Sequence, residues 1–254
     1  MKFRIVILAA GKGTRMKQDF PKALTPVAGQ PILKYLIESI LATELDSKPI
    51  IVTGPEGTRL CDDFGVDCEY VIQKEQLGTA HALHVSKDTV GDADGVIVLY
   101  GDHPFISADS LTQLSDRHSY GDNTITMMTA LVPSFNDWYC AFSHWGRILR
   151  GKEGHIRGIK EFKDASDDER KIKEVNPSLF CFDTKWLWEN IDKIGNKNAQ
   201  GEYYLTDLVA LAVEQGRRIS SLNIAPEEAI GINTPDECQV AEGIYEKILK
   251  ERNA

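Results

Sequence analysis

Short hydrophobic runs alternate along the chain with stretches in which apolar residues recur at helical spacing. The first run, residues 3–10, is continuous and shows no polar–apolar alternation, which is typical of a buried parallel strand. Further strands are predicted at 48–53, 68–72, 95–100 and 124–132, and helices at 31–45, 77–90 and 107–118. Strands that alternate with helices predict an α/β fold with a doubly wound, mostly parallel sheet.

The alternation of predicted strands and helices ends at about residue 134. Residues 145–149 and 155–159 predict a hairpin around 151–154, and 174–183 predicts one more strand. Helices are then predicted at 184–194, 206–215 and 235–251. The last of them begins with a capping box, in which Thr234 is the N-cap and Glu237 follows three residues later. We interpret residues 1–254 as one domain with an inserted lobe at about 134–204.

The first strand runs into a basic, glycine-rich turn. Gly11 and Gly13 follow the strand, Arg15 comes next, and Pro21 then precedes Lys22. Glycines allow the backbone to approach an anion, and exposed N–H groups and cations neutralise it. The turn therefore predicts phosphate binding; the alternative is a tight turn with solvated cations. It is neither a dinucleotide fingerprint, since Met16 replaces the third glycine, nor a Walker A loop.

Asp102 follows the buried strand at 95–100. Ligands of open α/β sheets bind beyond the carboxyl ends of the strands, and phosphate chemistry needs a divalent cation with oxygen ligands. Asp102 is therefore a candidate Mg²⁺ ligand, although it would also suit a turn before Pro104. Asn233, just before the last helix, is a candidate second ligand or an ordinary turn asparagine.

Polar residues at 73–80 and in the lobe could each bind a ligand or have an ordinary structural role. The segment 73–80 enters a helix, and its amides could read the edge of a base or simply start that helix. Glu161 and Asn176 in the lobe could bind sugar hydroxyls or be solvated. The six histidines form no ligand-like group, and we expect none of them to be catalytic.

Charge and cysteine content narrow the class of protein. The net charge of -9 argues against general binding of nucleic acid or of anionic membranes. Residues 1–22 nevertheless carry six cations and one anion, which favours a small anionic ligand. The five cysteines are scattered without metal-binding spacing, as expected of reduced thiols in a cytoplasmic protein. No segment is long enough to span a bilayer, and the N-terminal run is interpreted as a strand.

Several segments together resemble the sugar-1-phosphate nucleotidyltransferases. They are residues 8–16 with Pro21-Lys22, 76–82, 100–102, 163–165 and 198–207. The longest, Asn-Ala-Gln-Gly-Glu-Tyr-Tyr-Leu-Thr-Asp at 198–207, is far more specific than the glycine turn. Together they resemble the uridyltransferase half of the bifunctional N-acetylglucosamine-1-phosphate uridyltransferases/glucosamine-1-phosphate acetyltransferases. The likeness runs in order from about residue 4 to residue 240.

The resemblance implies a Rossmann-like nucleotidyltransferase fold with a sugar-facing lobe, and a role for each matching residue. The residues implied to bind the nucleotide are Leu8, Ala10, Gly11, Gly13, Gln73, Gln76, Gly78 and Thr79. Arg15, Lys22 and Asp102 are implied to be catalytic, with Asp102 and Asn233 on Mg²⁺. Tyr100, Gly146, Glu161, Asn176 and Thr206 are implied to face the sugar. The implied substrates are UTP and N-acetylglucosamine 1-phosphate, which give UDP-N-acetylglucosamine and pyrophosphate.

The chain departs from the family pattern in the lobe. Trp145 stands where the family has tyrosine, and Pro177-Ser178 stands where it has threonine and glycine. Proline lacks an N–H and serine adds a Cβ, so a different backbone is expected near the sugar. The same chemistry with another sugar or nucleotide, and a non-catalytic nucleotide-sugar sensor, are the alternatives. No hexapeptide repeats occur, so we expect no acetyl transfer, no trimer, and a monomer or homodimer.

Overall fold

The computed structural model describes residues 1–11, 13, 16, 18, 20–55, 57–198 and 200–252. Its main sheet has ten strands in the order β5-β4-β1-β6-β11-β7-β10-β8-β9, with β12 paired to β7. The strands are β1 (Phe3–Ala9), β4 (Ile50–Thr53), β5 (Glu69–Ile72), β6 (Gly95–Tyr100), β7 (Ile125–Leu131), β8 (Arg147–Arg150), β9 (Ile156–Lys160), β10 (Glu174–Val175), β11 (Phe180–Asp183) and β12 (Ile219–Ile224). The short strands β2 (Pro26–Val27) and β3 (Gln30–Pro31) form a separate pair.

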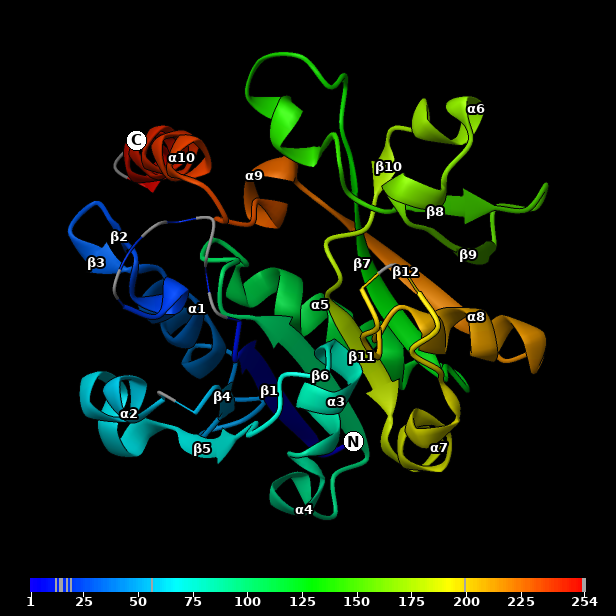
Figure 1. The fold of residues 1–254 in the computed structure, drawn as a ribbon, viewed down its shortest axis with the longest axis horizontal. Coiled ribbons are helices and arrows are strands. Elements are labelled where there is room, and N and C mark those ends of the chain that lie inside the picture. The colour runs from blue at the N-terminus through cyan, green and yellow to red at the C-terminus, as the bar shows by residue number, and fades with distance from the viewer. Residues whose placement is uncertain are drawn as a thin grey trace.

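The sheet is mostly parallel. β5, β4, β1 and β6 pair in parallel, and β12 pairs in parallel with β7. β11 lies antiparallel between β6 and β7, so these two strands point the same way. The antiparallel strands β8, β9 and β10 extend the sheet towards the upper right of Figure 1. The predicted α/β architecture with a doubly wound sheet is confirmed.

Helices cover both faces of the sheet. They are α1 (Ile32–Leu41), α2 (Thr58–Phe64), α3 (Thr79–His84), α4 (Lys87–Val90), α5 (Ala108–Ser119), α6 (Asp167–Arg170), α7 (Thr184–Asn190), α8 (Asp207–Glu214), α9 (Pro226–Ala229) and α10 (Pro235–Arg252). Ile5 and Ile7 of β1 pack in one core with α1, α5 and α10, whereas Val6 and Leu8 pack in a second core with α3, α7 and α8. Both faces of β1 are thus buried, which explains its unbroken apolar run. None of the described helices has the length and apolar character needed to cross a membrane.

Two predicted elements are broken. The helix expected at 77–90 is divided into α3 and α4, and the Ser86 hydroxyl between them donates to the Leu83 carbonyl (2.7 Å). The strand expected at 174–183 is divided into β10 and β11. Both breaks correct the sequence-based prediction. The elements α2, α6, α9, β2, β3 and β12 were not predicted. The sequence of β12, with two serines and an asparagine, lacks a continuous apolar run.

The break between β10 and β11 is a bulge against one edge of β7. Val175 pairs with Ala130 and Phe180 pairs with Met127, so residues 176–179 lie opposite only residues 128 and 129. Ladder pairing resumes where the Met128 N–H donates to the Leu179 carbonyl (2.9 Å). Bulges bend a strand and redirect its side chains, and this one turns residues 176–178 towards the site described below.

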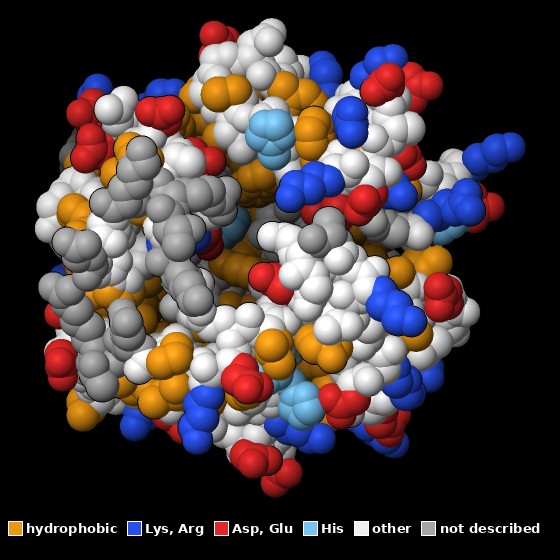
Figure 2. Space-filling view, in the orientation of Figure 1, with side chains coloured by type: hydrophobic (Ala, Val, Ile, Leu, Met, Phe, Trp, Pro, Cys, Tyr) orange, Lys and Arg blue, Asp and Glu red, His pale blue; other side chains and the backbone are white. Residues whose placement is uncertain are grey.

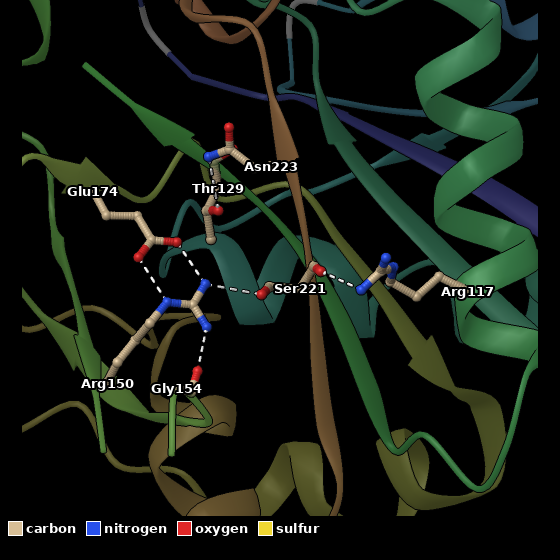
Figure 3. A network of polar contacts seen from close by, with 7 residues as sticks. All are labelled: Arg117, Thr129, Arg150, Gly154, Glu174, Ser221 and Asn223. Atoms are coloured by element: carbon tan, nitrogen blue, oxygen red, sulfur yellow. Dashed lines mark hydrogen bonds and ion pairs between the residues drawn. The ribbon is translucent and has the colours of Figure 1, made fainter. Parts of the chain in front are cut away.

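Polar contacts tie the outer strands to the rest of the sheet (Figure 3). The Arg150 guanidinium of β8 makes two bonds to the Glu174 carboxylate of β10, at 2.7 and 2.5 Å. It also donates to the Ser221 hydroxyl of β12 (2.9 Å) and to the Gly154 carbonyl (2.7 Å). A forked guanidinium–carboxylate pair fixes orientation as well as distance. The lobe is therefore attached to the sheet by side chains as well as by strand pairing.

Candidate active site

Two adjoining cavities lie beyond the carboxyl ends of β1 and β6. One has a volume of about 420 Å³ and the other about 210 Å³. Tyr100, the last residue of β6, and Asp102 line both of them. Figure 2 shows the surface hollowed near the middle of this face, with charged and hydrophobic side chains around the hollow. Open α/β sheets bind their ligands at this end of the strands.

The larger cavity collects most of the residues expected to bind nucleotide. Its lining includes Leu8, Ala10, Gly11, Gln73, Gln76, Gly78 and Thr79, together with Lys22 and Asp102. The sequence reasoning did not select Ala9, Ala23, Ala82, Gly101 or Glu202, which also line it. Small residues among these leave room for a ligand against the backbone. We call this cavity the nucleotide pocket.

Two glutamines hold the loop at 73–79 in place. Gln73 is buried, and its amide donates to the Gly78 carbonyl (3.1 Å) and to Nδ1 of His81 (2.9 Å). The Gln76 amide donates to the Ala10 carbonyl at the end of β1. These bonds connect the loop to the first strand, so each glutamine positions backbone as well as lining the pocket.

The segment 202–205 packs along the other side of this loop. The Tyr203 N–H donates to the Leu77 carbonyl (2.8 Å), and the Ala80 N–H donates to the Tyr203 carbonyl (3.0 Å). Gly78 has a φ of +114°, and a Cβ there would lie 2.6 Å from the Tyr203 carbonyl oxygen. Only glycine fits this close approach. The long sequence motif at 198–207 therefore supports the nucleotide pocket.

Lys22 joins the two cavities. Its ammonium donates to the Asp102 carboxylate and to the Asn233 amide oxygen (2.9 Å). Gly13 lies beside it, since a Cβ at Gly13 would be 3.0 Å from the Lys22 Cβ. Arg15 lies outside the residues that the structure describes. The structure thus brings together Lys22, Asp102 and Asn233, which are far apart in the sequence.

The position of Asn233 depends on the start of α10. The Thr234 hydroxyl accepts from the Glu237 N–H (3.3 Å), as the predicted capping box requires. The Glu237 carboxylate, however, accepts from the N–H of Asn233 (2.7 Å). A second bond runs from the Ile232 N–H to the Asp102 carbonyl (2.9 Å). Both candidate metal ligands are thereby fixed in one small region.

These oxygens suit a hard divalent cation. The Asp102 and Asn233 oxygens converge on a single point, because both accept from the same ammonium. No group of three or more His, Cys, Asp or Glu side chains among the described residues is arranged to hold a metal. Mg²⁺ typically takes only one or two protein oxygens and completes its shell with water and phosphate. Asp102 and Asn233 fit that requirement.

Charge around Asp102 favours its ionised form. Burial alone would raise the pKa of this carboxyl, but the neighbouring Lys22 ammonium, with a smaller effect of His103, holds the pKa below its usual value. His103 is itself buried, and its Nε2 lies 3.7 Å from the Asp102 carboxylate. A carboxylate that stays charged is what a cation site needs.

The smaller cavity collects residues expected to face a sugar. Gly146, Glu161 and Asn176 line it beside Tyr100, Asp102 and Asn233. Thr206 does not line it, but its hydroxyl donates to the Glu161 carboxylate over 3.5 Å. Burial raises the pKa of Glu161, although this contact lowers it in part. We call this cavity the acceptor pocket.

Sequence reasoning missed two residues of the acceptor pocket's surroundings, His103 and Arg147. His103 lines the pocket beside Trp145, and their rings are 5.7 Å apart; Trp145, Pro177 and Ser178, which the sequence analysis noted as departures from the family pattern, also line it. Arg147, in β8 behind it, is 1% exposed. The Arg147 guanidinium donates to the carbonyls of Phe142, Ser143, Trp145 and Arg170. No local signal indicates these bonds, because a buried arginine with carbonyl partners is recognised only once the loop is folded.

Comparison with known proteins places the chain in a family. Residues 5–156 match the MobA-like NTP transferase domain. The chain belongs to this family. The Bifunctional protein GlmU of Clostridium acetobutylicum is 38% identical over 96% of this chain and 52% of its own length. The corresponding protein of Geobacillus sp. (strain WCH70) is 40% identical over 97% and 52%. The chain thus spans about half the length of these curated relatives.

A solved structure has the same fold as this NTP transferase domain. It is a putative glucose-1-phosphate thymidylyltransferase from Bacillus anthracis, with a TM-score of 0.76. The match covers 95% of this chain and 94% of the other at 20% sequence identity. At that identity the likeness concerns the fold alone.

Proposed function

We propose that the chain is a sugar-1-phosphate uridylyltransferase. In this proposal it joins UTP and N-acetylglucosamine 1-phosphate to form UDP-N-acetylglucosamine and pyrophosphate. The observation that carries the proposal is the pair of adjoining cavities that share Tyr100 and Asp102. Two substrates can then bind side by side with their phosphates meeting at one charged point. The match to the MobA-like NTP transferase domain supports the choice of reaction class.

The proposed reaction is a displacement at phosphorus. A phosphate oxygen of the sugar 1-phosphate attacks the α-phosphorus of UTP, and the bond from that phosphorus to the pyrophosphate oxygen breaks. The protein contributes mainly position and charge, because the displacement needs little help from a base. The Lys22 ammonium would stabilise the negative charge on the phosphates, and Arg15 would supply a second cation.

The metal proposal follows from the same residues. Asp102 and Asn233 would hold Mg²⁺, which would supply Lewis-acid charge for the phosphate chemistry. The Lys22 ammonium now bonds both of those oxygens. It must therefore share them or shift towards a phosphate, and either outcome keeps positive charge at the reacting centre.

A different acceptor sugar is the second candidate. It is favoured by the acceptor pocket, where Trp145, Pro177 and Ser178 form part of the wall and depart from the family pattern. In either case the nucleotide pocket has the same role. The two candidates differ only in the group that the smaller cavity accepts.

Pyrophosphate release tests the proposal directly. The purified chain is incubated with UTP, MgCl₂ and, one at a time, N-acetylglucosamine 1-phosphate, glucose 1-phosphate and other sugar 1-phosphates. The proposal expects the fastest release with N-acetylglucosamine 1-phosphate and no release when EDTA is present. Faster release with another sugar would establish the second candidate. If none of the sugar 1-phosphates gives pyrophosphate release although UTP still binds in calorimetry, the chain is a non-catalytic sensor instead.

A further inference from the structure

The first turn of α10 departs from an ordinary capping box in one contact. In such a box the side chain at N3 accepts from the backbone N–H of the N-cap residue. α6 follows this rule, since the Glu169 carboxylate accepts from the Ser166 N–H (2.7 Å) and the Glu169 N–H donates to the Ser166 hydroxyl (3.3 Å). At α10 the Glu237 N–H donates to the Thr234 hydroxyl in the same way, but the Glu237 carboxylate accepts from the N–H of Asn233, one residue further back (2.7 Å).

Asn233 connects this contact to the candidate metal site. Its amide oxygen accepts from the Lys22 ammonium (2.9 Å), which also donates to the Asp102 carboxylate. Its backbone N–H is the donor to Glu237. An asparagine side chain has only two torsions, so the position of its backbone largely decides where its amide oxygen lies. Loss of the contact to Glu237 should therefore displace a metal ligand rather than remove one.

The residues just before Asn233 are held against the end of β6. The Ile232 N–H donates to the Asp102 carbonyl (2.9 Å). A Cβ at Gly231 would lie 3.1 Å from Nε2 of His103, so the backbone passes close to that ring. The segment 231–233 is thus fixed to Asp102 on one side and, through Glu237, to the helix on the other.

α10 is itself firmly packed on the core. Ala241 and Ile244 on its inner face are buried. The ring of Tyr245 lies 5.1 Å from the ring of Tyr35 in α1. The helix therefore presents Glu237 to the segment 231–233 from a fixed position.

We propose that Glu237 is a positioning residue for the metal site. Its carboxylate holds the Asn233 backbone and so keeps the Asn233 amide oxygen where it can share a cation with Asp102. The inference rests on the proposed function, in which Asp102 and Asn233 bind Mg²⁺. The role requires reach rather than charge, because the contact is a hydrogen bond to a backbone N–H.

The test measures how strongly a divalent cation assists the binding of UTP. The dissociation constant of UTP is measured by calorimetry in EDTA and in MnCl₂, without a sugar 1-phosphate, and the first value is divided by the second. Glu237→Asp keeps the negative charge but is one methylene shorter, whereas Glu237→Gln loses the charge but keeps an oxygen within reach. Glu237→Asp and Glu237→Ala are expected to lower this ratio by about 10-fold or more, as is typical when a group behind a metal ligand is lost. Glu237→Gln should keep the ratio within about twofold of wild type, because its amide oxygen still accepts from the N–H.

Three controls separate this role from helix capping in general. Glu169→Asp shortens the same carboxylate in the ordinary box of α6 and should leave the ratio unchanged. Thr234→Ala removes the hydroxyl that caps α10, and it should lower the melting temperature without changing the ratio. In an Asn233→Ala background, Glu237→Asp should have less than about a twofold further effect, because the ligand that it positions is already lost.

The outcomes distinguish this inference from the proposed function. A folded Glu237→Asp protein with the wild-type ratio would overturn the inference, and so would an equal loss of the ratio in Thr234→Ala. If Mn²⁺ does not assist UTP binding to the wild-type chain although pyrophosphate release with a sugar 1-phosphate persists, the inference is wrong and the transferase function stands. Absence of release with every sugar 1-phosphate would instead overturn the proposed function.

Discussion

The nucleotide pocket and the acceptor pocket meet at Asp102 but are built by different means. The nucleotide pocket takes its walls from strand ends and from the turns that follow them, in a parallel part of the sheet. The acceptor pocket takes its walls from a bulge and a hairpin in an antiparallel part. The first arrangement follows from the fold, whereas the second depends on particular side-chain contacts. Sequence changes in the second region should therefore alter the choice of substrate with less effect on the reaction itself.

The largest expected effect comes from Lys22, which contacts residues of both pockets. Lys22→Ala should lower kcat by on the order of 10²–10³-fold, as is typical when a group that stabilises transition-state charge is removed. The KM values for the two substrates should change much less. Turnover is measured by pyrophosphate release, and folding by circular dichroism.

Lys34→Ala is the matched control for Lys22, since Lys34 is an exposed lysine of α1. It should retain wild-type turnover. A folded Lys22→Ala protein with near-normal kcat would remove Lys22 from the reaction and separate the two pockets functionally.

The second prediction concerns the acceptor region. Arg147→Met leaves several buried carbonyls without a donor and should lower the free energy of unfolding by about 3 kcal/mol. The Phe142–Gly146 segment should then loosen, so that the KM for the acceptor rises more than the KM for UTP. Urea unfolding and steady-state kinetics measure the two effects. Arg117→Met removes a single bond to the Ser221 carbonyl and serves as the control; an equal loss in both variants would contradict the prediction.

The third prediction concerns the nucleotide region. Gly78→Ala introduces a Cβ that meets the Tyr203 backbone and forces alanine into a positive φ. The expected cost is about 2 kcal/mol, and the KM for UTP should rise at least several-fold. Gly91→Ala separates the two causes, because Gly91 has a φ of +61° but nothing within 4 Å of an added Cβ. Equal effects of both substitutions on the KM for UTP would mean that the Tyr203 contact is irrelevant to nucleotide binding.

The smallest expected effect is a pH dependence at Glu161. Burial raises the pKa of this carboxyl in the folded protein, so folding favours its protonated form. The contribution of Glu161 to the free energy of unfolding is fully present below the unfolded pKa. It is lost as pH rises through the folded pKa. Glu161→Gln should therefore melt at a higher temperature than wild type near neutral pH, and the difference should vanish at acidic pH. Thermal melts from pH 4 to pH 8 measure it. Glu153→Gln, at an exposed position, should show no such trend.

The difference between the two pockets also explains why one could be predicted from the sequence better than the other. The nucleotide pocket has local signals: a buried strand, a glycine turn and a strand-end aspartate, so Lys22 and Asp102 could be selected before the fold was known. The strand predicted at 174–183 was wrong at its centre, because the bulge is created by pairing with β7 rather than by local composition. Arg147 was missed for a similar reason, since its carbonyl partners come together only in the folded loop. The resemblance to a family supplied Glu161 and Asn176, which composition alone did not distinguish from solvated residues.

One edge of β7 pairs with β11 along its first half and with β10 along its second half. Because both segments use the same strand, the acceptor wall and the central sheet should open as one cooperative unit. The backbone amides of Val175 and Cys181 should accordingly exchange their hydrogens at similar, slow rates. Removal of the lobe would take away both β10 and β11, and β7 in the central sheet would lose its partners along this edge. The lobe therefore cannot be exchanged without rebuilding the central sheet.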